Sequence, residues 1–291
     1  MDAITIIEPK KPEEFHVIEE IQKKAWGMQD IEVVPYRIII AMKHAGGSVY
    51  IAKYFDKSVG FVVGFIGINK GKLFLHSHQL GVVPEFWGKN IGYFLKLKQR
   101  EHAIKLNLDL IKWTFDPLLS RNAYLNFNKL GVTCKEFHTN FYGIMQDAIN
   151  KGLPSDRFYV DWWIRSKRVA NRLNGEKPPQ IEELLSANLP IINKTKQRNN
   201  YRIIDDLNLN LKDKVILVEI PGDLNVIKNK SMNDAMDWRM KTRAIFQKLI
   251  NEDHYIVIDF VSGLVNGERR SFYILGNQSE KEILSGNWWE K

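Results

Sequence analysis

The sequence predicts a mixed α/β fold built from two domains. Three observations support this. A helical pattern and three hairpin-linked strand patterns come first, helical and strand patterns then alternate, and a second group of strands and helices follows a polar stretch. Such alternation favours a mixed sheet with helices packed on its faces. We predict a larger domain over residues 1–168, a linker over 169–200 and a smaller α/β domain over 201–291.

The predicted elements of the larger domain follow from periodicity. Over residues 12–27, apolar side chains recur at spacings of three and four, which is typical of a helix. Acidic residues stand near the start of this segment and lysines near its end, as the helix dipole favours. A second helical segment, 33–43, ends at a Gly-Gly pair. The remaining elements are strands at 48–55, 58–68 and 72–82 joined by short hairpin-type turns, a helix at 91–106, a strand at 109–114, a helix at 120–130, and strands at 132–137 and 157–166.

The second half of the chain begins with polar and breaking residues. Residues 175–179 and 194–200 are predicted as breakers on either side of one short helix at 181–187. The smaller domain follows with a strand at 215–220, a helix that Ser231 caps and that runs to residue 250, and strands at 255–261 and 271–275.

The composition is that of a globular protein, with 44% hydrophobic and 26% charged residues. No apolar run approaches the ~20 residues that cross a bilayer. The first residues lack the basic segment of a signal peptide. The single cysteine, Cys134, excludes an intrachain disulfide framework and is expected to be a buried, inert thiol. We therefore expect a cytoplasmic protein without a membrane partner.

The net charge of +8 is concentrated in the first domain. Residues 1–168 carry 24 Lys and Arg against 17 Asp and Glu, or +7, whereas residues 169–291 carry 18 against 17, or +1. Nucleic acid is disfavoured as a partner because the chain lacks an Arg-rich arm, a Cys/His finger and an aromatic RNA-binding pattern. A polyanionic small ligand explains the excess equally well.

The segment between the third strand and the next helix carries the strongest functional signal. A tight turn over residues 87–92 leads directly into the helix, whose N-terminus faces whatever the turn holds. Helix N-termini and turn amides suit phosphates. Just upstream, His76 and His78 lie two residues apart, on one face of a strand. The arrangement predicts transfer chemistry on a phosphate-bearing cosubstrate.

This segment resembles motifs of the GCN5-related N-acetyltransferase superfamily, the acyl-CoA-dependent N-acyltransferases, and the resemblance covers about residues 4–167. In that family a small residue and Val end the strand, as in Gly81-Val82 here, and a Gln/Arg-x-x-Gly-x-Gly/Ala turn wraps the coenzyme A pyrophosphate. Trp87 replaces the Gln/Arg, and Asn90 replaces the first glycine. Asn is the non-glycine residue that best tolerates a left-handed backbone.

The resemblance implies an acyl-CoA N-acyltransferase fold, with acetyl-CoA or another acyl-CoA as cosubstrate. A closer likeness is to a bacterial and archaeal subfamily of predicted acyltransferases with an extra C-terminal unit, through residues 113–118, 140–143 and 218–221. No metal is implied, because the histidines lack further ligands at a diagnostic spacing. The residues expected to contact the coenzyme are Leu80, Gly81, Val82, Gly88, Lys89, Asn90, Gly92 and Asn122.

The histidines are the candidate base. The run His-Ser-His-Gln-Leu-Gly-Val resembles the His-x-His strand of the arylalkylamine N-acetyltransferases. An amine is mostly protonated at neutral pH, and a base such as His78, with His76, would make it nucleophilic. The alternative is that both are structural histidines. Phe127 stands where the family often has the tyrosine acid, so Tyr142, Tyr124 or water must protonate the leaving thiolate.

Three charged residues are candidates for substrate contact. Asp116 precedes a proline at a strand end, and its alternative role is to cap the next helix. Arg239 and Arg243 lie one helical turn apart and could hold a carboxylate of the substrate. The alternative is that both form ion pairs at the protein surface.

Together these features predict direct transfer of an acyl group, expected to be acetyl, to the amine of a small molecule. Two other functions stay open: a non-catalytic acyl-CoA-binding module, and an acyltransferase acting on protein or RNA. The sequence leaves open the acceptor, the acyl group, the role of the C-terminal domain and whether the chain forms a homodimer.

Overall fold

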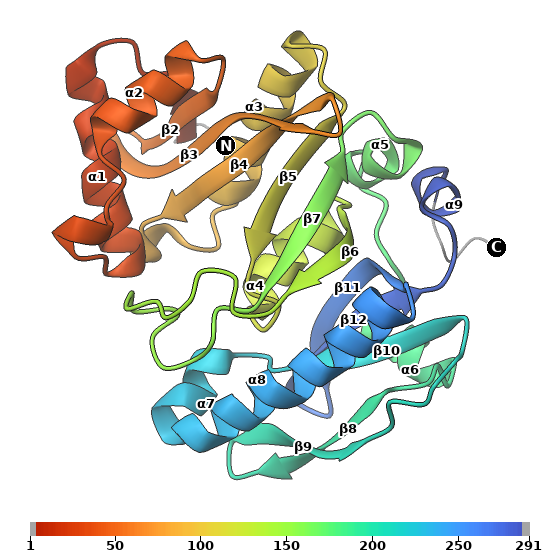
Figure 1. Cartoon of the computed structure of the whole chain (residues 1–291). Coiled ribbons are helices and arrows are strands. Elements are labelled where there is room, and N and C mark those ends of the chain that lie inside the picture. The colour runs from red at the N-terminus through yellow and green to blue at the C-terminus, as the bar shows by residue number, and fades with distance from the viewer. Residues whose placement is uncertain (1–3, 287–291) are drawn as a thin grey trace. The chain divides into compact units, whose positions relative to one another are not determined.

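A computed structural model describes residues 4–286, which fold into two compact units (Figure 1). Within the described range, the first unit comprises residues 4–113 and 146–151, and the second comprises 114–145 and 152–286. This division by packing falls inside the predicted first domain, so the boundaries at residues 168 and 200 stay a prediction. Residues 1–3 and 287–291, at the outer ends of the predicted domains, lie outside the described part.

The first unit is built on an antiparallel meander, as predicted. Its strands follow the order β1-β2-β3-β4-β5, antiparallel as far as β4, after which β4 and β5 are parallel. Strand β1 adds to the edge of β2 and has no counterpart in the prediction. The elements are β1 (Ile4–Ile7), α1 (Pro12–Trp26), α2 (Tyr36–His44), β2 (Ser48–Tyr54), β3 (Lys57–Asn69), β4 (Lys72–Val82), α3 (Ile91–Lys105) and the first four residues of β5 (Leu110–Phe115), whose last two belong to the second unit.

Helices cover both faces of this meander (Figure 1). On one face, Phe15 and Ile18 of α1 and Ile39 of α2 pack with alternate residues of β2 and β3, such as Phe61 and Val63. On the other face, the N-terminal part of α3 packs on a second set of strand residues. The strands therefore carry one set of side chains towards α1 and α2 and the alternate set towards α3.

The second unit also has a mixed α/β composition. Its main strands follow the order β7-β6-β11-β12-β10, and β8 and β9 form a separate hairpin. The elements are α4 (Ser120–Ala123), which continues as a π-helical stretch Tyr124–Lys129, β6 (Thr133–His138), β7 (Arg157–Trp163), α5 (Lys167–Leu173), α6 (Ile181–Ser186), β8 (Asn193–Arg198), β9 (Tyr201–Leu207), β10 (Val215–Ile220), α7 (Leu224–Lys230), α8 (Met232–Phe246), which continues as a π-helical stretch Gln247–Glu252, β11 (Ile256–Val265), β12 (Glu268–Gly276) and α9 (Glu280–Leu284).

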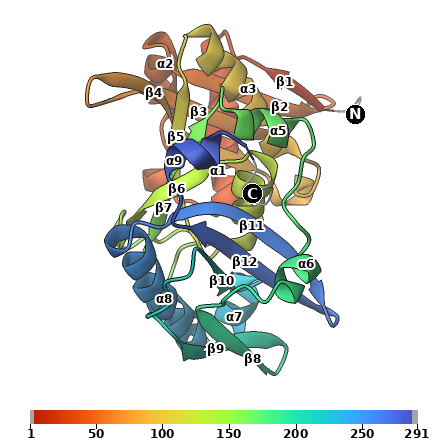
Figure 2. The ribbon, with the colours of Figure 1, turned by 90° about the vertical axis from the view of Figure 1, so that its right-hand side faces the viewer.

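The sheet of the second unit is also covered on both faces. Phe272 and Ile274 of β12 belong to the core that includes Ile181 of α6, and Figure 2 shows α6 beside β11 and β12. Tyr273 points to the opposite face, where its ring meets Phe246 of α8 at a centroid distance of 5.8 Å. Mixed α/β architecture, predicted from sequence, is thus confirmed in both units.

The largest departure from the prediction lies in the polar stretch after β7. Residues 194–200, predicted as a breaker, form most of β8 and the turn that joins it to β9, with Asn199 in a left-handed conformation. Polar strand residues are held there by side-chain bonds, such as that from Thr195 Oγ1 to Glu219 Oε2 at 2.7 Å. The helices α5, α7 and α9 were not predicted, because their five to seven residues are too short for a clear period.

None of the helices in residues 4–286 combines the length and hydropathy that a membrane-spanning helix requires.

Candidate functional site

Strands β4 and β5 part after a short parallel pairing. Leu75 pairs with Ile111 and His76 with Lys112, and within the described chain these are the register pairs that join the two strands. Strand β4 continues to Val82, while β3 pairs along its other edge. After His76, the edge of β4 that faces β5 therefore makes no ladder hydrogen bonds with that strand. Backbone donors and acceptors along this edge are available to another partner, because a strand carries such groups on both edges.

A β-bulge in β4 lies at the start of this unpaired edge. Val63 of β3 is opposite Gln79 and Gly64 is opposite Ser77, so His78 is the additional residue. A bulge re-aims the side chains that follow it and is over-represented next to active sites. Here it places Gln79 on the face of α1, whereas Ser77 stays on the face of α3.

The two predicted base residues lie together on β4. Their ring centroids are 6.2 Å apart, and the ring of Phe65 on β3 contacts both, at 4.9 Å from His76 and 5.7 Å from His78. Phe65 shares its strand face with Val63, which belongs to the core under α1 and α2. Both histidines therefore belong to the side of the sheet that α1 and α2 cover.

Both histidines favour the neutral form. Burial, followed by the charges of His78, Lys96 and Lys112, lowers the pKa of half-buried His76 to about 4. His78 is more exposed, but partial loss of hydration lowers its pKa as well. A neutral imidazole can accept a proton at pH 7, and the stronger shift makes His76 the weaker base.

Gln79 is a polar residue of this face that the sequence analysis did not single out. Its Nε2 donates to Gln22 Oε1 at 3.3 Å, and Gln22 in turn bonds both backbone groups of Val34 in the segment between α1 and α2. Gln79 Oε1 is buried without a hydrogen-bond partner among residues 4–286. A buried acceptor of this kind is costly and is a natural partner for a ligand N–H.

The turn before α3 has the backbone conformation that the sequence predicted. Gly88 and Asn90 both adopt a positive φ, +80° and +61°, and Asn90 immediately precedes α3. The first N–H groups of a helix have no acceptor within the helix. The turn residues Gly88, Lys89 and Asn90 are exposed, and Gly92 lies in the first turn of the helix. The arrangement suits an anion.

Trp87 and Lys89 hold this turn against neighbouring elements. The indole Nε1 of Trp87, in place of the family's Gln/Arg, donates to Val82 O at 2.8 Å and so ties the turn to the end of β4. Lys89 Nζ lies 5.4 Å from the ring centroid of Tyr54. Among the strand residues predicted to contact the coenzyme, Gly81 is buried, and a Cβ there would lie 2.8 Å from Phe61 Cε1, so its missing side chain also serves packing.

A buried lysine on α3 is the second residue that sequence reasoning missed. Lys96 is 3% exposed, and its Nζ donates to Ser77 Oγ at 2.6 Å. The same Ser77 hydroxyl donates to Gln99 Oε1 at 2.8 Å, and Gln99 Nε2 donates to Ser48 Oγ at 3.0 Å. The spacing of Lys96 and Gln99 on the inward face of a helix was the available signal. Lysine at such a position is rarely buried.

The other predicted site residues belong to the second unit. Asp116 is buried, and its Oδ2 pairs with Arg239 Nη2. Burial favours the neutral acid, but the charge and hydrogen bond of Arg239, with Arg157 at 3.8 Å, keep the Asp116 pKa below its usual value. Asp116 Oδ1 accepts from Leu118 N in a local turn. The alternative role given to it from the sequence, capping the next helix, is wrong, because Leu119 is the N-cap of α4 and no side chain caps that helix. Arg239 Nε and Nη1 are buried without a partner in the described chain.

Arg243, Tyr142 and Asn122 have different surroundings. Arg243 makes a two-point ion pair with buried Asp156. Tyr142 is 46% exposed, and its hydroxyl lies 2.8 Å from Thr114 Oγ1. Asn122 is exposed on α4. The structure therefore brings His76 and His78 together and places the turn in the same unit. It pairs the predicted arginines with acids of the second unit.

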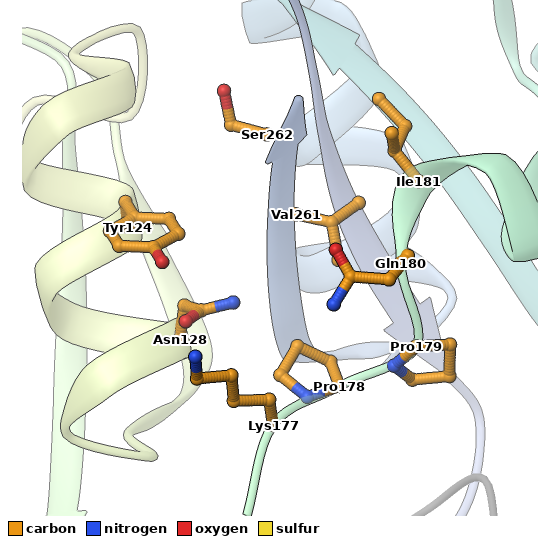
Figure 3. A pocket seen from close by; sticks show the side chains of 9 residues that line it. All are labelled: Tyr124, Asn128, Lys177, Pro178, Pro179, Gln180, Ile181, Val261 and Ser262. Carbon is orange, nitrogen blue, oxygen red and sulfur yellow. The ribbon is translucent and has the colours of Figure 1, made fainter. Parts of the chain in front are cut away.

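The second unit also carries a small pocket of about 100 Å³ (Figure 3). Tyr124 and Asn128 form one wall, and the segment from Lys177 to Ile181 forms the other. Tyr124 was one of the residues considered for the acid, and its ring extends from the helix towards this pocket. None of the predicted coenzyme, base or arginine residues lines it.

Groups of three or more His, Cys, Asp or Glu side chains that could hold a metal do not occur among the described residues.

No family model and no curated protein matches the chain. Solved structures of similar shape include yncA of Salmonella typhimurium with acetyl-CoA, with a TM-score of 0.46 and 14% identity over 62% of this chain and 99% of that one. Naa50 of Arabidopsis thaliana with a bisubstrate analogue has a TM-score of 0.44 and 17% identity over 55% and 97%. A GNAT family acetyltransferase of Elizabethkingia anophelis with acetyl-CoA bound has a TM-score of 0.40 and 17% identity, over 56% of this chain and 99% of that one.

Proposed function

We propose that this protein is an acyl-CoA-dependent N-acyltransferase that moves an acyl group, with acetyl as the first candidate, to the amine of a small molecule. The observation that carries the proposal is the parting of β4 from β5 next to the turn with left-handed Asn90. An unpaired strand edge offers amides to a pantetheine arm, and the turn and helix N-terminus offer amides to a pyrophosphate. The residues Leu80 to Val82 and Gly88 to Gly92 would hold the coenzyme.

The proposed chemistry is direct attack of the amine on the thioester. A base must remove a proton from the acceptor ammonium or amine, and His78 is the better base of the pair because its ring is the more exposed one. His76, beside it at 6.2 Å between centroids, would orient the ring or relay the proton through water. Gln79 Oε1 would accept a hydrogen bond from the amine.

A covalent acyl-enzyme on cysteine is disfavoured. Cys134 is the single thiol of the chain and is buried. Burial raises the pKa of this thiol far above its ordinary value, so the thiolate nucleophile is not formed at neutral pH. Direct transfer needs no such nucleophile, and proximity of the two bound substrates supplies much of the rate.

One observation favours a non-catalytic acyl-CoA-binding module as the second candidate. Phe127 is fully buried at the position where the resembled family often has its acid, and its ring contacts Phe115 and Tyr273. The replacement thus serves packing in this chain. Tyr142, with its hydroxyl at 2.8 Å from Thr114 Oγ1, is the proposed substitute acid.

Two measurements separate these functions. Calorimetry with coenzyme A and acetyl-CoA tests binding, and release of the coenzyme thiol in the presence of an amine panel tests turnover. The panel contains amino acids, aryl amines, polyamines, peptides with a free N-terminus and RNA, because protein and RNA acceptors are the remaining alternatives. Binding with turnover on a small amine supports the proposal. Binding without turnover on any acceptor indicates the module, and lack of binding rejects both.

A further inference from the structure

The amine of Lys96 occupies the point at which β4 and β5 part. The last register pair of the two strands is His76 with Lys112, so Ser77 and Trp113 are the first residues beyond it. Lys96 Nζ lies 2.6 Å from Ser77 Oγ and 3.5 Å from the ring centroid of Trp113. The amine of an α3 residue thus bridges the two strands at the closed end of the unpaired edge.

The length of this edge places the reactive end of a bound thioester there. From Ser77 to Val82 the strand advances five residues, about 16 Å at the usual rise. The pyrophosphate end of the coenzyme belongs, in the proposed function, at the turn beyond Val82, and the extended pantetheine arm spans a comparable length. Its thioester then approaches the closed end, where Lys96 lies.

The surroundings of Lys96 make its amine an unusual one. The ammonium form has no salt-bridge partner among residues 4–286, and its polar neighbour is the neutral Ser77 hydroxyl. The Trp113 ring at 3.5 Å favours the ammonium form, but it supplies no negative charge to offset burial. Burial lowers the pKa of Lys96 well below that of ordinary lysine. A neutral amine keeps its lone pair and is nucleophilic, whereas only about a thousandth of an ordinary lysine is neutral near pH 7.4.

We propose that Lys96 is an internal acyl acceptor, modified by the acyl-CoA bound along β4. Lys96 Nζ attacks the thioester carbonyl, a C–N bond forms and the C–S bond breaks. The amine loses one proton, which the departing thiolate takes up, so the products are an amide on Lys96 and free coenzyme A. This inference rests on the proposed coenzyme site, and it adds a covalent modification at the end of that site.

The test compares two lysines of one helix in the chain of 291 residues without any substitution. Lys98 is partly exposed, pairs with Glu101 at 2.7 Å and serves as the internal control. The protein is incubated with acetyl-CoA near pH 7.4, and peptide mass spectrometry follows acetylation at each position over time. A parallel incubation contains an excess of desulfo-coenzyme A, which has no thiol and competes for the site.

We expect acetylation of Lys96 to exceed that of Lys98 by about tenfold or more, to saturate with acetyl-CoA, and to be suppressed by desulfo-coenzyme A. If calorimetry shows coenzyme binding while Lys96 is acetylated no more than Lys98, the inference fails and the proposed function stands. Modification that the competitor does not suppress also rejects the inference, because the donor is then not in the site. Absence of coenzyme binding overturns both.

Discussion

Arg243 and Asp156 form a two-point ion pair, with Nε at 2.9 Å from Oδ2 and Nη2 at 2.7 Å from Oδ1. Arg239 pairs with buried Asp116 at a single point, through its Nη2. Both guanidinium groups thus have carboxylate partners within their own unit. Ion pairing, the alternative that the sequence left open, is therefore better supported than recognition of a substrate carboxylate.

The Arg239 pair yields a prediction about stability. Truncation of Arg239 to Ala leaves Asp116 buried without its main partner, which typically costs about 3–5 kcal/mol of unfolding free energy. The control is Arg198→Ala, because Arg198 is 48% exposed and pairs with Asp234 at the surface, where such pairs contribute about 0–1 kcal/mol. Urea denaturation measures both. A weakened affinity for a carboxylate-bearing substrate at unchanged stability would instead support recognition.

Asn90 allows a test of the coenzyme turn. Asn90→Val should weaken coenzyme A binding, because a β-branched residue resists the φ of +61° found there. Asn90→Gly should retain binding. The control is Asn107→Val, since Asn107 has a φ of +54° just beyond the other end of α3 and therefore undergoes comparable strain. Calorimetry that gives equal affinity for Asn90→Val and the wild type would reject the turn assignment.

The histidine pair is tested by changing both residues. Replacing His76 and His78 with Gln should lower turnover at neutral pH by roughly ten- to ten-thousand-fold, the usual range for loss of a general base. Affinity for coenzyme A should stay nearly constant. The single His78→Gln variant should show most of the loss. Retention of the wild-type rate and pH profile in the double variant would make both histidines structural.

Local patterns predicted most of the first unit. The apolar period of residues 12–27 and the glycines and turn residues between the strands specify elements that depend on near neighbours, and the observed bounds differ by a few residues. The positive φ of Asn90 was also predictable, because few residues tolerate it. What local patterns could not specify is register. The bulge at His78 depends on pairing with β3, which the sequence of β4 alone does not encode.

The remaining site residues depend on long-range contacts. Lysine is usually an exposed residue of a helix. Lys96 is buried because it packs against Ser77, a residue 19 positions earlier in the chain, and this contact is not visible in the sequence of the helix. Arg239 is separated from Asp116 by 123 positions, so its pairing could not be read from the helix on which it lies. The hairpin over residues 193–207 was missed because polar strands lack the apolar alternation by which strands are recognised.

His76 gives a pH dependence of stability. Its pKa is about 4 in the folded protein and about 6.5 in the unfolded chain, so unfolding takes up a proton between these values. The contribution of neutral His76 is complete above pH 6.5 and is lost as the pH falls to 4. His76→Gln should flatten the fall of unfolding free energy in this window. Proton NMR of the imidazole provides the direct measurement, and a titration midpoint near 6.5 would contradict the burial effect.

Lys96 should make the free energy of unfolding depend on pH in the alkaline range. Its folded-state pKa lies well below the unfolded value of about 10.4, so between these two values the unfolded chain binds a proton that the folded protein does not. Unfolding free energy therefore rises with pH through this window. In Lys96→Met, residue 96 no longer takes up a proton on unfolding. Methionine replaces lysine there with an unbranched apolar side chain of similar length. It should stabilise the protein at pH 7, with a gain that shrinks as the pH approaches 10.

Urea denaturation at several pH values between 7 and 10 measures this gain. Lys98→Met on the same helix is the control, because its partly exposed ammonium pairs with Glu101, and its effect should not change with pH in the same way. Loss of the bond to Ser77 Oγ opposes the gain, since a typical hydrogen bond contributes about 1 kcal/mol. A destabilisation of the Lys96→Met variant that is equal at pH 7 and pH 10 would mean that this amine is retained for packing and hydrogen bonding, and that its charge has no part in the stability of the first unit.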